Sequence, residues 1–284
     1  MGTQPSPETL RVSLPSSSLP LSCPADERAT KASATRHDIL RHFDEVFSEA
    51  PASEGKDIED AYRLRYQVYC LDRGFESADA CPQGMEKDRY DDHALHCLLR
   101  DRAAARPIGT VRLVRPAATP TWFSGLPLAA YAPQESMAEI MRLPAGSTAE
   151  VSRFAITRAS REVLRSAKVF SGKPDMATSL PNVGERLLPF MSLGLIRGLV
   201  RLSMLNGITH WCLAAEPSLL RRLRTFGLHF QDAGDLVEHR GLRQVCYAEL
   251  SSLLERAEDE QPEFWDVITE GGLLTAGNLA WNAA

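Results

Sequence analysis

The chain has 284 residues, of which 44% are hydrophobic and 24% are charged, so it can bury the core of one large domain or of two small ones. Its formal net charge of −5 argues against nucleic-acid binding through bulk electrostatics, because such domains normally carry a basic excess. The six cysteines show neither a CxxC pair nor a zinc-type spacing, which favours reduced thiols in a cytoplasmic protein over a disulfide scaffold or a structural metal.

Composition divides the chain into three parts. Residues 1–35 are rich in Ser, Pro, Thr and Ala and hold few large apolar groups, which predicts a disordered tail. The same prolines and serines interrupt the apolar core that a secretory signal needs, so export is not expected. We expect a folded domain over residues 36–258, followed by a C-terminal helix and tail over residues 259–284.

The first predicted elements are a strand and a helix. The stretch HFDEVFSEA (42–50) alternates well enough to predict a strand. Residues 57–70 then place apolar side chains at the spacing of one helix face, which predicts a helix with Asp57 as its N-cap.

Three strands are predicted next, over ALHCLLRD (94–101), PIGTVRLVR (107–115) and AEVSRFAI (149–156). The segment 120–148 contains proline and glycine without a clear period, which predicts a long loop with short helical pieces. Cys97 and Cys212 lie inside strand-like runs and are expected to be buried apolar residues rather than nucleophiles.

The second half alternates helices and strands. The apolar run 187–205 keeps helical spacing behind a capping-box-like pair, Asn182 and Glu185. Arg197 and Arg201 stand in the middle of this run, which disfavours a membrane span because each would be costly at a bilayer centre.

A strand is predicted over residues 209–216, followed by a helix that starts at Pro217 and ends with Gly227 as its C′ residue, and by a closing strand over residues 244–251. This order predicts a mixed α/β domain around one sheet.

Charged residues stand at places where packing residues are expected. Arg65 lies on the apolar stripe of the first helix, so its guanidinium needs an anion inside the protein, and Asp88 and Asp91 are suitable. These residues form either a structural ion pair that pins the 75–92 loop or part of a functional site. Asp92, His93 and His96 stand near Asp91, but no further ligand cluster accompanies them, so no metal is expected.

The central strands also carry internal charges. Arg112 shares a strand face with Ile108 and Thr110, while Glu150 opens the next strand and Arg153 follows three residues later. A structural ion-pair network could explain each of these residues taken singly. Because the charges occur together, and because perturbed buried charges concentrate at functional sites, the joint pattern favours a site.

Four ordered motifs carry a family resemblance: RLRYQVYCLDRGF (63–75), EKDRYD (86–91), IGTVRL (108–113) and EVSRFAI (150–156). Together they resemble the acyl-homoserine lactone synthase branch of the GNAT acyltransferase superfamily. They are more closely similar to long-chain N-acyl amino acid synthases and to acyltransferases associated with PEP-CTERM/exosortase systems. HRGLRQ (239–244) and PEFWDVITEGG (262–272) also resemble that group, so the resemblance spans roughly residues 41–272.

The resemblance implies an α/β (α+β) GNAT-like fold, in which helices flank a mixed, mostly antiparallel twisted sheet with splayed central strands. It implies transfer of a fatty acyl group from a thioester, usually on acyl carrier protein, to the α-amine of an amino-acid-like acceptor. The family's functional positions fall here on two catalytic residues, Glu150 and Arg153, and on a substrate-binding set of Arg65, Tyr69, Phe75, Asp88, Asp91 and Arg112.

The chemistry fits these residue types. An ammonium group is no nucleophile, so a carboxylate such as Glu150 could remove a proton before the amine attacks the thioester carbonyl. A backbone N–H on a splayed strand could then stabilise the oxyanion. No covalent acyl-enzyme and no bound cofactor are required.

The donor is expected to be an acyl-phosphopantetheine thioester on a carrier protein rather than on coenzyme A. The Arg-x-x-Gly-x-Gly/Ala turn with which ordinary GNAT enzymes hold the CoA pyrophosphate is absent before residues 183–205. Between residues 153 and 173 six basic residues accompany Glu162 alone, so an acidic carrier protein could be steered there. We assign carrier binding to Arg158, Arg161, Arg165 and Lys168; the alternative is a solvated helix face.

Two other functions stay open at this point. The chain could be an acyl-homoserine lactone synthase that uses S-adenosylmethionine, although the position of Phe75 is often Trp in that branch. It could also be a non-catalytic acyl-binding module, but pure binding would not need a base such as Glu150.

Strand geometry sets a condition on this assignment. In a regular strand side chains alternate, so Glu150 and Arg153 would point to opposite faces and could not serve one site. The sequence therefore predicts a β-bulge or a splay within residues 149–156. It also predicts that Arg65, Asp88, Asp91, Arg112, Glu150 and Arg153 converge on one cleft.

Overall fold

A computed structural model describes residues 39–116, 121–160 and 183–275, with side chains from residue 190 onward in the last range. Its centre is a seven-stranded sheet in the order β1-β2-β3-β4-β5-β7-β6. The strands are β1 (Phe47–Pro51), β2 (Ala94–Asp101), β3 (Arg106–Val114), β4 (Thr148–Ile156), β5 (His210–Ala215), β6 (Gln231–Glu238) and β7 (Leu242–Glu249). Neighbouring strands are antiparallel except β4 and β5, which are parallel.

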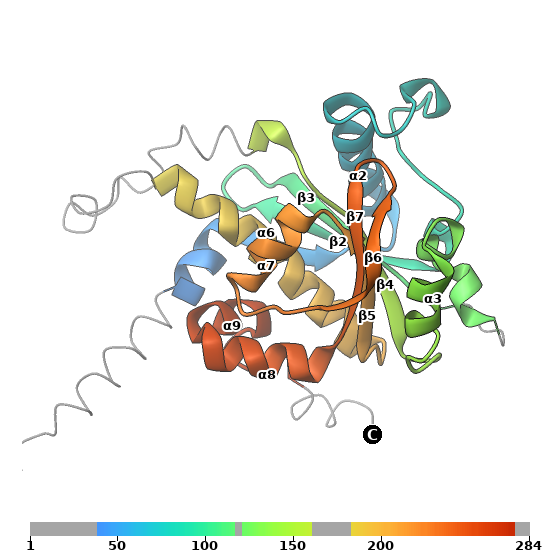
Figure 1. The fold of residues 1–284 in the computed structure, drawn as a ribbon. Coiled ribbons are helices and arrows are strands. Elements are labelled where there is room, and N and C mark those ends of the chain that lie inside the picture. The colour runs from blue at the N-terminus through green and yellow to red at the C-terminus, as the bar shows by residue number, and fades with distance from the viewer. Residues whose placement is uncertain (1–38, 117–120, 161–182, 276–284) are drawn as a thin grey trace, which may run out of the picture. The chain divides into compact units, whose positions relative to one another are not determined.

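The helices lie around this sheet (Figure 1). They are α2 (Gly55–Arg65), α3 (Gln134–Ile140), α6 (Val183–Leu205), α7 (Pro217–Arg224), α8 (Leu250–Glu260) and α9 (Pro262–Thr269). The α2 helix continues directly into a π-helix, η1 (Tyr66–Asp72), and short 3₁₀ turns occur at η2 (Ala78–Ala80), η3 (Asp91–His93), η4 (Trp122–Gly125) and η5 (Pro127–Ala130). The expected mixed, mostly antiparallel sheet flanked by helices is confirmed.

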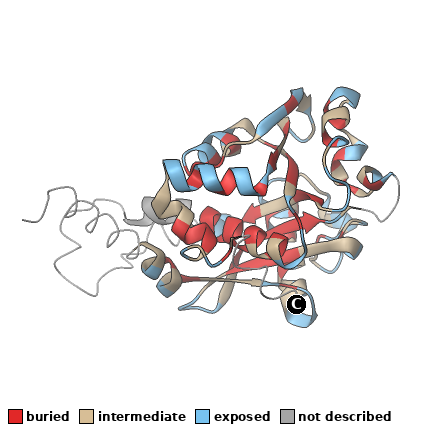
Figure 2. Ribbon diagram, turned by 90° about the horizontal axis from the view of Figure 1, so that it is seen from below, coloured by how far each residue is buried: buried red, intermediate tan, exposed pale blue. Residues whose placement is uncertain are grey.

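The core lies where α6 crosses β1, β2 and β3. Residues 191–200 of α6 are all buried, and Figure 2 shows this concentration of buried residues in the helix and the strands beneath it. Gly198 and Gly194 allow the close approach, because a Cβ on Gly198 would lie 2.2 Å from Cys97 Sγ and one on Gly194 would lie 2.6 Å from Leu99 Cδ1.

Arg197 and Arg201 of α6 form ion pairs with carboxylates elsewhere in the chain. Arg197 donates to Asp44 at 2.8 Å and to Glu49 at 2.6 Å, and Arg201 donates to Glu49 at 3.0 Å. The arginines inside this apolar helix are thus neutralised by Glu49 of edge strand β1 and by Asp44 in the helical segment before it. None of the described helices is long and apolar enough to cross a membrane.

Most of the predicted elements are confirmed. Strands at 94–101, 107–115, 149–156, 209–216 and 244–251 occur within two residues of the expected bounds, the loop before β4 holds short helical pieces, and Cys97 and Cys212 are buried. Gly227 has φ +78° behind α7, and the Leu228 N–H donates to the Leu223 carbonyl, as expected of a helix-terminating glycine.

Three predictions are wrong. Residues 39–46 are helical and the strand starts only at Phe47. Within the helical segment Arg41 and Glu45 form an i,i+4 ion pair, a spacing that supports a helix rather than a strand. The N-cap of α2 is Glu54, and Asp57 instead accepts a hydrogen bond from Arg100 at 2.8 Å.

The third error is the missed strand β6, an edge strand in which Ala233 is the buried residue. Its exposed, polar sequence lacks the hydrophobic alternation that would reveal a strand.

Some predictions fall on residues outside the described ranges: the tail at 1–35 and the cap residue Asn182. The α9 helix lies within the segment expected to hold a C-terminal helix, and the domain boundary after residue 258 stays a prediction.

The close approach of α6 to β2 can be tested by Gly198→Ala. The added methyl group would meet Cys97 Sγ at 2.2 Å, and overpacking of this kind costs about 1–3 kcal/mol. Chemical denaturation should show a lower free energy of unfolding for Gly198→Ala. The control is Gly146→Ala, where a Cβ meets nothing within 4 Å; equal stability of the two variants would contradict the packing described here.

Candidate active site

A cluster of buried ion pairs lies between α2 and the central strands. Arg65, which is 0% exposed, donates through Nε to Glu86 Oε2 at 2.6 Å and through Nη1 to Asp91 Oδ1 at 2.6 Å. Arg112 on β3 donates to Asp91 Oδ1 at 2.8 Å and to Asp88 Oδ1 at 2.7 Å. Each buried guanidinium therefore has carboxylate partners, as a charge removed from water requires.

The arginines keep these carboxylates ionised. Burial by itself would raise the pKa of Glu86, but Arg65 and Arg153 outweigh it and lower that pKa to about 2. Burial likewise opposes ionisation of Asp91, yet hydrogen bonds and charge from Arg65, with the charge of Arg112, lower its pKa well below the usual range.

His96 lies behind this cluster, and burial together with the charge of Arg65 lowers its pKa to about 4, so it is neutral at neutral pH. Among the described residues, no group of three or more His, Cys, Asp or Glu is arranged to hold a metal ion.

The third arginine, Arg153, enters the cluster through a β-bulge. Thr110 pairs with Ala155 but Arg112 pairs with Ser152, so Arg153 and Phe154 together oppose the single residue Val111. Arg153 has a left-handed backbone with φ +51°, which is uncommon for a residue other than glycine. The predicted interruption of this strand is confirmed.

The bulge turns Arg153 onto the same side as its carboxylate partners. Its Nη2 lies 2.9 Å from Glu86, 3.1 Å from Asp88 and 3.2 Å from Glu76. Its guanidinium also lies 5.1 Å from the centre of the Tyr69 ring, a cation–π contact. Tyr69 itself comes from the π-helix η1, a form that often occurs at functional sites.

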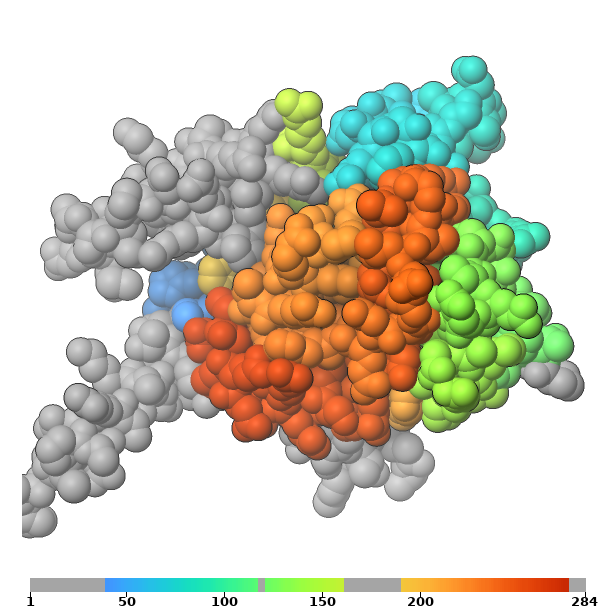
Figure 3. Space-filling view, in the orientation of Figure 1, coloured from blue at the N-terminus to red at the C-terminus, as the bar shows by residue number. Residues whose placement is uncertain are grey.

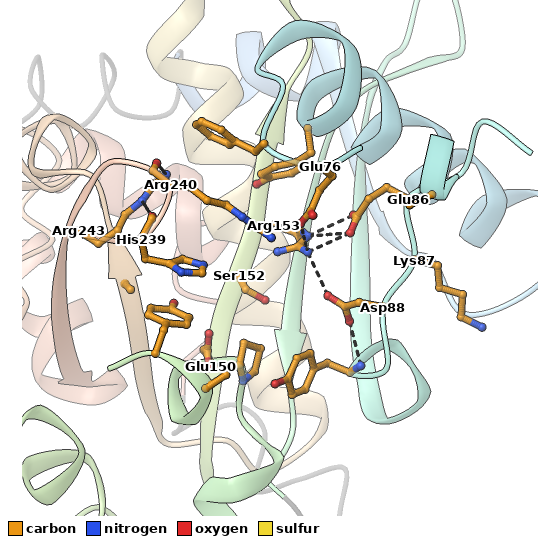
Figure 4. A pocket seen from close by; sticks show the side chains of 18 of the residues that line it. Glu76, Glu86, Lys87, Asp88, Glu150, Ser152, Arg153, His239, Arg240 and Arg243 are labelled. Carbon is orange, nitrogen blue, oxygen red and sulfur yellow. Dashed lines mark hydrogen bonds and ion pairs between the residues drawn. The ribbon is translucent and has the colours of Figure 1, made fainter. Parts of the chain in front are cut away.

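A cavity of about 420 Å³ opens beside Arg153 (Figure 4). Charged and aromatic side chains from distant parts of the chain line it, including Tyr69, Phe75, Glu76, Glu86, Asp88, Tyr131, Glu150, Arg153, His239, Arg240 and Arg243. We call it the polar pocket.

Glu150 lies at the floor of the polar pocket. It is 2% exposed, and its Oε2 accepts a hydrogen bond of 2.8 Å from the Leu128 N–H. Burial raises the pKa of Glu150 to about 8, although that hydrogen bond and the charges of Arg112 and Arg153 act in the opposite direction. A carboxyl group with such a pKa can take up or release a proton near neutral pH.

The strands β4 and β5 separate at this residue. Their pairing covers only Thr148–Glu150 and His210–Cys212, which confirms the expected splay. Where they diverge lies a second cavity of about 120 Å³, which we call the apolar pocket. Val151 and Phe154 of β4, Trp211 and Leu213 of β5 and Leu199 of α6 line it, and Val151, Tyr69 and Arg153 line both pockets.

Of the six charged residues predicted to converge on one cleft, only Asp88, Glu150 and Arg153 line it. Tyr69, Phe75, Asp88, Glu150 and Arg153 line the polar pocket. Arg65, Asp91 and Arg112 lie behind its wall and reach it through Glu86, Asp88 and Arg153. The roles of these residues stay predictions.

Several pocket residues were not predicted. Glu86 is the first residue of the EKDRYD motif, and its pairing with Arg65 could have been inferred from the need of that arginine for an anion. Glu76 and Tyr131 stand in turns without a periodic pattern. His239 and Arg240 lie in the β6–β7 turn and Arg243 lies at the start of β7; all three belong to the HRGLRQ motif, which carried the resemblance but was given no site role.

Of the predicted carrier-binding residues, Arg158 is exposed just after β4. Arg161, Arg165 and Lys168 lie outside the described residues.

Comparison with known proteins agrees with this geometry. Residues 64–167 match the family described as an acetyltransferase (GNAT) domain. That segment contains the π-helix, the ion-pair cluster and the bulged strand. The chain therefore contains a GNAT-type acyltransferase domain, and the protein is an acyltransferase.

Several solved structures are similar to this chain. The crystal structure of TofI in a ternary complex with an inhibitor and MTA is 20% identical, with a TM-score of 0.50 over 77% of this chain and 99% of that one. FeeM, an N-acyl amino acid synthase from uncultured soil microbes, is 15% identical, with a TM-score of 0.48 over 76% of this chain and 97% of that one.

BjaI, a CoA-dependent acyl-homoserine lactone synthase solved with SAM and isopentyl-CoA, is 17% identical, with a TM-score of 0.48 over 79% of this chain and 88% of that one. No curated protein matches the sequence significantly.

The raised pKa of Glu150 predicts a pH-dependent stability. Because the folded-state pKa, about 8, lies above the ordinary value, the stabilising contribution is fully present below the unfolded-state pKa and is lost as pH rises through about 8. The melting temperature of the native protein should therefore fall relative to that of Glu150→Gln between pH 5 and pH 9. A constant difference across this range would show that Glu150 titrates normally.

Proposed function

We propose that the protein is an N-acyltransferase that moves a long-chain fatty acyl group from an acyl carrier protein thioester to the α-amine of an amino acid or a similar amine. The observation that carries the proposal is the position of Glu150. It is the last residue of β4 that pairs with β5, with the polar pocket beside it and the apolar pocket beyond the split. The same proposal includes a cytoplasmic location and a relationship to PEP-CTERM/exosortase-associated acyltransferases.

Glu150 acts as the general base. An amino acid binds as an ammonium ion, which must lose a proton before it can attack a thioester. A carboxylate with a pKa of about 8 is a much stronger base than an ordinary glutamate and is still ionised in part at neutral pH. The neutral amine then attacks the thioester carbonyl and forms a tetrahedral intermediate. Its collapse breaks the C–S bond, and the departing thiolate takes up the extra proton of the attacking nitrogen, so an amide forms and the carrier leaves as a free thiol.

The splayed strands receive the donor. The apolar pocket binds part of the acyl chain between β4 and β5, where hydrophobic side chains from both strands meet. Beyond Glu150 the backbone of β4 is not paired with β5, so an N–H on that side can donate a hydrogen bond to the developing oxyanion. The positive charges of Arg158 and of the basic residues that follow it in the sequence attract an acidic carrier protein.

The charged cluster holds the acceptor side of the site. Tyr69, Phe75 and Asp88 contact the acceptor, and Arg153 fixes Asp88 and Glu86 in the pocket wall. The buried residues Arg65, Asp91 and Arg112 act as positioning residues, because they reach the pocket only through these neighbours.

The proposal is tested by mass spectrometry of lipid extracts from cells that express the protein. Cells with the native protein should accumulate an N-acyl amine, and its mass distinguishes an N-acyl amino acid from an acyl-homoserine lactone. Glu150→Gln preserves the acceptor atom for the Leu128 N–H but removes the base, and we expect product to fall about 100-fold or more.

The matched control is Glu59→Gln on the exposed face of α2, where both partners of the Arg63–Glu59 pair are 50% exposed. This variant should retain activity. Undiminished product from Glu150→Gln would contradict the general-base role. A second assay tests the choice of donor: the purified enzyme is given the acyl group either on acyl carrier protein or on coenzyme A, and the two rates are compared.

A further inference from the structure

The turn between β6 and β7 reaches across the mouth of the polar pocket. Arg240 and Gly241 at its tip both have left-handed backbones, with φ +54° and φ +93°. Figure 3 shows this orange hairpin meeting the cyan segment that holds Phe75 and Glu76. Two segments separated by more than 150 positions in the chain thus close one side of the pocket.

The backbone of this turn is fixed by its neighbours. His239 stacks on Tyr131 with ring centres 3.7 Å apart and planes 4° apart. Arg243 donates to the carbonyl oxygens of His239 at 3.2 Å and of Arg240 at 3.0 Å, and the Gly241 N–H donates to Glu238 at 3.0 Å. The left-handed backbone of Arg240, held by these contacts, fixes the direction in which its Cα–Cβ bond leaves the turn.

The side chain of Arg240 has a replaceable partner. Among the described residues its guanidinium forms one ion pair, from Nη1 to Glu76 Oε1 at 2.5 Å. Glu76 also contacts Arg153 at 3.2 Å, but Arg153 keeps closer partners in Glu86 and Asp88. If Glu76 moved away, Arg153 would therefore keep its carboxylate partners, whereas Arg240 would lose the partner of its ion pair.

The solvent exposure of the Arg240 and Glu76 side chains also indicates that this ion pair can open. The side chains of Arg240 and Glu76 are 34% and 23% exposed, whereas those of Arg65 and Asp91 are 0% exposed. Because Glu76 is partly in solvent, it can turn outward without leaving a buried charge behind. A carboxylate from a ligand can then take its place with no change in the charge of the pocket.

We propose that Arg240 is a specificity-determining residue that binds a carboxylate of the amine acceptor in place of Glu76. This inference rests on the proposed function. The amine of the acceptor lies toward Glu150 and its carboxylate toward Arg240, with His239 between these two residues in Figure 4. The Tyr131 ring stacks on His239 and completes this part of the pocket lining. An amine without a carboxylate leaves the Arg240–Glu76 pair closed.

The test compares acceptors that differ only in this group. Each amino acid that the native enzyme acylates is assayed beside the same compound with its carboxylate converted to a carboxamide, one carboxylate at a time where it has two. For the carboxylate acceptor, Arg240→Gln should raise KM about 10-fold or more with kcat changed less than about 2-fold, as expected for the loss of a charge-assisted hydrogen bond used in binding. The KM for the carboxamide should not change.

Two variants complete the design. Arg240→Gly accepts the left-handed backbone without strain and also removes the guanidinium, so it serves if Arg240→Gln fails to fold. Arg221→Gln changes an exposed arginine on α7 that does not line the polar pocket, and it should leave KM unchanged for both compounds.

The outcomes separate the two proposals. If the native enzyme acylates no amine, the proposed function is wrong and the role of Arg240 falls with it. The native enzyme could acylate amines with and without a carboxylate equally well, or Arg240→Gln could raise KM equally for the carboxylate and the carboxamide acceptor. Either result would leave acyl transfer in place and overturn the role of Arg240.

Discussion

The left-handed backbone of Arg153 is the constraint on which the site depends. A regular strand would point Glu150 and Arg153 to opposite faces of the sheet. The bulge between Thr110 and Arg112 adds one residue to β4 and brings both side chains to the polar pocket. A left-handed residue other than glycine costs about 1–3 kcal/mol. The carboxylates of Glu86, Asp88 and Glu76, all within 3.2 Å of the Arg153 guanidinium, supply the interactions that hold it there.

The same geometry gives the two acids of the pocket opposite electrostatic environments. Glu86 lies between two guanidinium groups, and its pKa falls to about 2, whereas Glu150 is buried with one backbone donor, and its pKa rises to about 8. One carboxylate is therefore a fixed charge that organises the site, and the other can exchange a proton. The divergence of β4 from β5 immediately after Glu150 brings this proton acceptor to the opening between the strands.

The sequence predicts much of this arrangement, because its signals there are periodic or chemically costly. Alternating apolar residues predict β2, β3 and β4. The charged residues inside those strands, Arg112 and Glu150, indicate a site, because burial of a charge costs free energy unless a partner or a ligand compensates it. Edge strand β6 was not predicted because most of its side chains face solvent, so its sequence does not alternate apolar and polar residues. Glu76 and Tyr131 were not predicted because loop conformation, rather than a local pattern, brings them to the pocket. Arg240 stands in the HRGLRQ motif, but that motif served only the resemblance and no role was assigned to its residues. The first strand was misplaced because residues 42–50 are too few for alternation to exclude a helix, and the chain changes from helix to strand at Phe47.

The central claim is that Glu150 accepts the proton of the acceptor amine, and the pH dependence of kcat/KM for acyl transfer tests it most directly. The ammonium group of the acceptor also titrates, so the profile should be measured with two acceptors whose amine pKa values differ by about one unit or more. This account predicts a rise in kcat/KM near pH 8 that is common to both acceptors, because it belongs to Glu150, and a second step that moves with the amine. A profile that follows the amine pKa alone, with no enzyme group between pH 6 and pH 9, would contradict the account.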